Sequence, residues 1–68
     1  MNEAAQERIV ELMDGKREPD RHAMKVFVKM LDTEECRLRD FVAVGGIKLG
    51  HAVALAWWQD GFDMRMDK

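Results

Sequence analysis

The sequence predicts one small α+β domain with the element order α-β-β-α-β, on the basis of three patterns. Residues 24–30 place an apolar side chain at every second position, which is typical of a half-buried strand. Residues 38–44 are rich in valine and phenylalanine and end at Gly45-Gly46, as a second strand and its turn would. Residues 62–67 alternate between apolar and charged side chains, which predicts a third strand.

An N-terminal helix is predicted over residues 2–14. Asn2 can cap it, Gly15 can end it, and the apolar residues between them recur at helical spacing. The polar segment 16–21 holds the only proline and is predicted to be a linker. The chain is therefore expected to form a single domain over residues 1–68, with a ββαβ unit over residues 22–67.

A second helix is expected after the glycines, where Leu49, Val53 and Ala56 mark one helical face and Gly61 is a stop signal. As a right-handed crossover, this helix predicts a three-stranded antiparallel sheet of order 2-1-3 packed against helices. Residues 24–31 also satisfy helical spacing. An all-α helical hairpin through residues 22–60 therefore remains the alternative.

Size and charge limit the classes of function. The chain has 68 residues, and Cys36 is its only cysteine. The core of so short a chain gives only marginal stability without a disulfide, which favours oligomerisation or partner binding. A lone cysteine suits a cytoplasmic location. The net charge of −2 gives no attraction to nucleic acid or membranes. The apolar stretch 41–58 has Lys48 and His51 near its middle, which argues against a membrane span.

The residues that catalysis needs are scarce. The sequence has no serine and no tyrosine, its only hydroxyl side chain is Thr33, and its only thiol is Cys36. His22 and His51 are far apart and lack the spacing of metal ligands. We therefore expect no enzyme activity, no cofactor and no metal. A helix-turn-helix drawn across residues 38–55 would offer DNA only two polar side chains, which is poor for recognition.

The second helix has more apolar surface than one interface needs. His51, Leu55 and Trp58 lie on a flank beside the face that would cover the sheet. A helix with apolar surface on two sides is buried twice, and tryptophan is enriched at binding hot spots. We expect this flank to bind a protein partner and a second copy of the chain, giving a homodimer. The competing interpretation is that both tryptophans complete the core.

Nucleic-acid binding is the alternative function. In the predicted register, Phe27 lies opposite Phe41 on the outer face of the sheet. The same face carries the bases Lys25, Lys29, Arg37 and Arg39. Rings that stack on bases and cations that hold phosphates are used by single-stranded nucleic-acid binders. The acidic net charge argues against it, because such binding depends on phosphate contacts.

The segment Ala54-Leu55-Ala56-Trp57-Trp58-Gln59, followed by Gly61-Phe62, resembles the junction between helix and last strand in small phage-encoded inhibitors of host enzymes. The resemblance covers residues 54–62 and the order of elements. It implies that blocking a host protein is a suitable role for the domain. The leading expectation is therefore a non-catalytic protein-binding regulator or inhibitor, of phage or mobile-element type.

Overall fold

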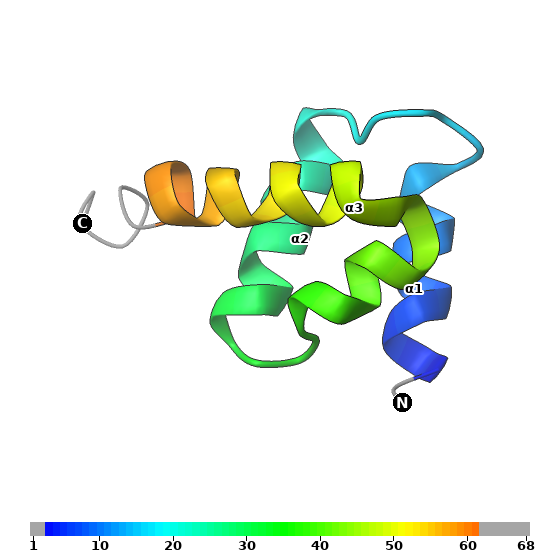
Figure 1. Cartoon of the computed structure of the whole chain (residues 1–68), viewed down its shortest axis with the longest axis horizontal. Helices are drawn as coiled ribbons and strands as arrows, with labels where there is room; N and C mark the ends of the chain where they lie inside the picture. The colour runs from blue at the N-terminus through cyan, green and yellow to red at the C-terminus, as the bar shows by residue number, and fades with distance from the viewer. Residues whose placement is uncertain (1–2, 62–68) are drawn as a thin grey trace.

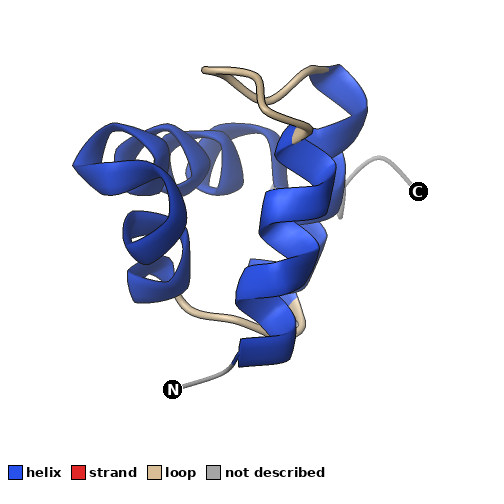
Figure 2. Ribbon diagram, turned by 90° about the vertical axis from the view of Figure 1, so that its right-hand side faces the viewer, coloured by secondary structure: helices blue, strands red, loops and turns tan. Residues whose placement is uncertain are grey.

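A computed structural model describes residues 3–61, and all of their regular structure is helical. The elements are α1 (Glu3–Met13), α2 (Arg21–Asp32), α3 (Leu38–Ala56) and a π-helical turn, η1 (Trp57–Gly61). No strand occurs in residues 3–61, so the predicted α+β fold with its three-stranded sheet of order 2-1-3 is wrong (Figure 2). The alternative that the sequence left open, an all-α helical hairpin, belongs to the observed fold class. The strand predicted over residues 62–67 lies outside the described residues.

The segment predicted as the first strand forms most of α2. As a strand, it would place Phe27 on the same face as Lys25 and Lys29, so burial of the ring would carry both charges inward. The helix separates them, because Phe27 is completely buried while both lysines are exposed. Asp20 caps the helix, and its Oδ1 accepts a hydrogen bond from the Ala23 N–H at 2.7 Å. That hydrogen bond also holds the pKa of the Asp20 carboxyl below its usual value.

The segment predicted as the second strand forms the start of α3. The preference of valine and phenylalanine for strands is small in energy compared with packing, and packing determines the secondary structure of this segment. Phe41 has no exposed surface and meets Phe27 edge to face, with ring centroids 5.2 Å apart. Asp40 is buried too, and its Oδ2 accepts a hydrogen bond from the Arg37 N–H at 2.8 Å. Asp40 therefore helps to satisfy the N-terminus of α3 rather than interrupting a strand.

Gly46 divides α3 into two straight halves, residues 38–45 and residues 47–56. Its φ of 81° and ψ of −178° lie in a region that only glycine adopts without strain. The bend falls where a helix-turn-helix would have its turn. Gly50 then allows the halves to approach closely, because a Cβ at this position would overlap the Val42 side chain. The glycines that were expected to end a strand thus form a corner inside one helical segment.

The three helices share one core. α1 and α2 lie beside each other, and the two halves of α3 pack across both of them (Figures 1 and 2). Every helix contributes completely or nearly completely buried side chains, among them Ile9, Phe27, Met30, Phe41 and Val53. The corner at Gly46 directs the second half of α3 over α2, with one flank facing solvent (Figure 1).

Candidate protein-binding surface

The second half of α3 and the start of η1 carry an exposed stripe, here called the α3 face, made of Ile47, His51, Leu55 and Trp58. Ile47 is 78% exposed, Leu55 46% and Trp58 71%, and His51 is also exposed. Spacings of four, four and three residues place these side chains within an arc of roughly 80° on a helix. Single exposed apolar residues are common, but a contiguous apolar patch is typical of an interaction site.

A shallow groove of about 480 Å³ lies along this face. It is lined by Leu31 from α2, by Leu38 from the start of α3, and by His51, Ala54, Leu55, Trp57 and Trp58. The structure thus places the three residues predicted to bind a partner, His51, Leu55 and Trp58, in the lining of one groove. Apart from the imidazole of His51 and the indole N–H groups, the lining side chains are hydrocarbon, so the groove suits an apolar side chain.

The two tryptophans have different environments. Trp57 is half-buried, and its indole Nε1–H donates a weak hydrogen bond to Oδ1 of Asp32 at 3.4 Å. Trp58 is 71% exposed. Adjacent helical residues point about 100° apart, so one tryptophan can pack on α2 while the next faces solvent. Trp57 therefore belongs to the fold, and Trp58 is available for contact.

The α3 face is almost uncharged. Residues 47–59 contain no acidic side chain, and Lys48 is their only strong base. One lysine offers little to a phosphate backbone, since nucleic-acid binders neutralise several phosphates. An apolar surface with a tryptophan is, by contrast, typical of the centre of a protein–protein interface.

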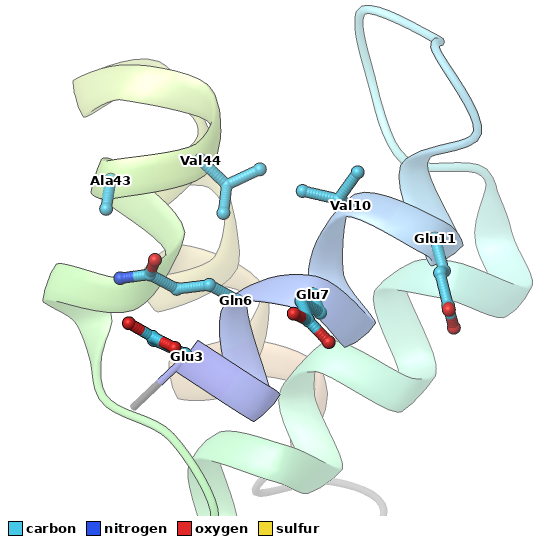
Figure 3. Close-up of a pocket in the computed structure, with 7 residues that line it drawn as sticks. All are labelled: Glu3, Gln6, Glu7, Val10, Glu11, Ala43 and Val44. Carbon is cyan, nitrogen blue, oxygen red and sulfur yellow. The ribbon is translucent and has the colours of Figure 1, made fainter. Parts of the chain in front are cut away.

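A second open groove, of about 710 Å³, lies between α1 and the first half of α3. Figure 3 shows its lining, which comprises Glu3, Gln6, Glu7, Val10, Glu11, Ala43 and Val44. Val10 and Val44 point toward each other across it, while carboxylates follow the α1 side. No ion pair among residues 3–61 involves Glu3, Glu7 or Glu11, so this side of the molecule is negatively charged and repels phosphate.

The residues predicted to bind nucleic acid do not form one surface of rings and bases, because the rings are buried and the bases are exposed. Phe27 and Phe41 do meet, but in the core, where neither ring has exposed surface on which a base can stack. Lys25 and Lys29 lie on the exposed side of α2. Arg37 and Arg39 are exposed at the start of α3. The aromatic and basic sheet face on which that alternative depends is therefore absent from residues 3–61.

Cys36 is a buried, unreactive thiol. Burial raises its pKa to about 11, and the nearby carboxylates of Asp40 and Glu35 act in the same direction. Because the thiolate is the nucleophile, very little of it is present at neutral pH. Within residues 3–61, no group of three or more histidine, cysteine or acidic side chains is arranged to hold a metal ion.

This environment predicts slow alkylation of Cys36. At pH 8, iodoacetamide should modify the folded chain far more slowly than the same chain in concentrated urea, where the pKa returns to about 8.5. Intact-mass spectrometry over time measures both rates. Equal rates in the two conditions would show that the thiol is accessible in the folded state.

One segment, Leu38–Gln59, is long and apolar enough to cross a membrane by length and composition alone. In the structure it is bent at Gly46. At 1.5 Å per residue, the straight parts before and after the bend measure only about 12 Å and 20 Å, whereas the hydrocarbon core is about 30 Å thick. In this folded form, neither straight part is long enough to span a bilayer.

Sequence reasoning missed three residues of this surface. Ile47 is the most exposed large apolar residue of the described chain, and Leu31 and Leu38 line the groove. Ile47 stands four residues before His51, a spacing that could have extended the predicted flank. Leu31 and Leu38 carry no such signal, because only the packing of α2 against α3 brings them to the groove.

Comparison with known proteins found no related protein. No protein-family profile matches the sequence, and no curated protein or solved structure shows significant similarity to the chain. The resemblance to small phage-encoded inhibitors therefore stays a prediction. The order of elements that supported it included two strands over segments that are helical in the structure, and the last strand lies outside the described residues.

Proposed function

We propose that this chain is a non-catalytic regulator that binds a protein through the α3 face and thereby blocks that protein. One observation carries the proposal: the exposed Ile47, Leu55 and Trp58 lie with His51 along one side of the helix, beside an apolar groove. Water-exposed apolar surface of this kind is stabilised when a protein covers it. A cytoplasmic location belongs to the proposal, because Cys36 is the only cysteine and a reducing compartment keeps it unpaired.

Site-specific photo-crosslinking in the native host tests the proposal. Benzoylphenylalanine would replace Leu55 on the α3 face. In a matched variant it would replace Lys25, which is exposed on the basic side of α2 and not on the apolar α3 face. We expect position 55 to form an adduct with one host protein, and position 25 to form none with that protein.

Adding Trp58→Glu to the Leu55 variant provides the control for the surface itself. We expect the adduct to disappear, because a carboxylate at the centre of an apolar interface remains unpaired and desolvated. Three results would refute the proposal: equal adducts from both positions, adducts only with nucleic acid, or a host adduct that persists with Trp58→Glu.

A further inference from the structure

We propose that the α3 face is covered by a second copy of the same chain, in a two-fold dimer whose two α3 helices run antiparallel over residues 47–58. The proposal rests on the proposed function in one respect, since it takes the α3 face to be a protein interface. It goes further by naming the occupant. Spacing, charge and area support it.

The spacing of the stripe is complementary to itself. In an antiparallel pair centred between residues 52 and 53, Ile47 lies opposite the partner's Trp58, and His51 lies opposite the partner's Ala54, about one residue's rise (~1.5 Å) from the partner's Leu55. The two most exposed apolar side chains of the described residues thus cover each other. A parallel pair would instead place each lysine, Lys48, beside its copy. The antiparallel pair moves Lys48 toward the C-terminal end of the partner's helix, where a cation is favoured.

Charge distinguishes the α3 face from the other exposed helix surfaces. The outer side of α1 carries Glu3, Glu7 and Glu11 without an ion pair, so it repels its own copy. The exposed side of α2 carries the bases Arg21, Lys25 and Lys29, so it also repels its own copy. Two-fold contacts bring identical surfaces together. Unlike these two surfaces of α1 and α2, the α3 face meets its copy without facing rows of like charge, because Lys48 is the only strongly charged side chain in residues 47–59.

The exposed area lies somewhat below that of a standard specific interface, which is the size expected of a weak contact. A large aromatic residue can bury about 150–250 Å², so the exposed part of Trp58 offers on the order of 150 Å². Ile47 and Leu55 raise the apolar area to roughly 350 Å² per copy, or about 700 Å² for the pair. Covering Leu38, Ala54 and the aliphatic part of Lys48 extends the total toward the ~1,000 Å² at which specific interfaces begin. A weak, reversible dimer is therefore expected.

Such a dimer would regulate the proposed function by mass action. The second copy and the blocked protein would compete for the same face, so dissociation of the dimer must precede blocking. Chain concentration would then set the fraction of copies that are free to bind.

Sedimentation equilibrium of the full chain tests the dimer. At chain concentrations on the order of 100 µM, we expect a mass twice that of one chain. Trp58→Glu should give a monomer whose helical circular dichroism is unchanged, because Trp58 is largely exposed. Val10→Glu is the matched control: it makes the same type of change at a residue that is 54% exposed on α1, and it should remain a dimer.

Each other result has a defined meaning. A monomeric unmutated chain overturns the dimer and leaves the proposed function standing if Leu55 still crosslinks to a host protein. A dimeric Trp58→Glu variant, or a monomeric Val10→Glu variant, refutes the α3 face as the dimer contact. A monomer that instead sediments with vesicles of anionic phospholipid assigns the face to a membrane surface. Species larger than a dimer contradict a closed two-fold contact.

Orientation is measured in the same protein. Benzoylphenylalanine in place of Ile47, in mixtures of isotopically light and heavy chains, should crosslink between copies to the segment around the partner's Trp58. Crosslinks from Ile47 to the segment around the partner's residue 47 would indicate a parallel pair and overturn the antiparallel arrangement.

Discussion

Replacing Phe27 with alanine is expected to remove most of the stability of this protein. Phe27 has no exposed surface and packs against Phe41 at the centre of the core, at an interplanar angle of 62°. Truncating a buried phenylalanine costs about 3–5 kcal/mol, because apolar burial is lost and a cavity remains. A chain of this length has a total free energy of unfolding of only about 3–10 kcal/mol. Urea denaturation followed by circular dichroism should show a much lower midpoint or no cooperative transition.

Two variants make this test specific. Phe27→Leu keeps most of the buried volume and should cost less than about 1.5 kcal/mol. Val10→Ala removes methyl groups from a side chain that is 54% exposed and should change stability by no more than about 0.5 kcal/mol. If Phe27→Ala had the same denaturation midpoint as the unmutated chain, Phe27 would not be a core residue. An unchanged midpoint is the result expected if Phe27 were exposed on the outer face of the sheet that the sequence predicted.

Replacing Gly46 with L-alanine is expected to destabilise the corner of α3 by about 1–3 kcal/mol. A Cβ at this position meets no atom within 4 Å, so the cost arises from the backbone alone, at a φ of 81° and ψ of −178°. The α3 face depends on this corner, because it directs the second half of α3 over α2. The loss should appear in urea denaturation, and self-association should weaken with it.

D-Alanine at the same position is the matched control, and a chain of this length is accessible to chemical synthesis. The mirror image of the Gly46 conformation lies in the extended region that L-residues favour, so the D-residue should adopt it without strain. We expect D-alanine to preserve or raise the stability, since it also restricts the unfolded chain. If L-alanine and D-alanine gave equal stabilities, φ at residue 46 would not control the bend.

The exposed flank of the last helix could be predicted from the sequence more fully than the fold, while its binding to a protein stays a prediction. His51, Leu55 and Trp58 were identified from spacing alone, and the structure places them along one groove. The prediction did not depend on the sheet, because residues 47–59 are helical in both interpretations. The proposed nucleic-acid surface depended completely on the sheet. It was lost when Phe27 and Phe41 proved to meet inside the core.

The sequence by itself determined local properties: a break at the glycines, a segment without acidic side chains over residues 47–59, and the absence of most nucleophiles. Only the tertiary structure decided between strand and helix for residues 24–30 and 38–44, because the apolar residues of 24–30 satisfy both periods and residues 38–44 offered only strand propensity. Burial of Phe27 against Phe41 resolves this ambiguity, since a helix buries both rings and leaves Lys25 and Lys29 in water. The same packing decided which tryptophan is free: Trp57 is held by Asp32, and Trp58, one residue further along the helix, is left to solvent.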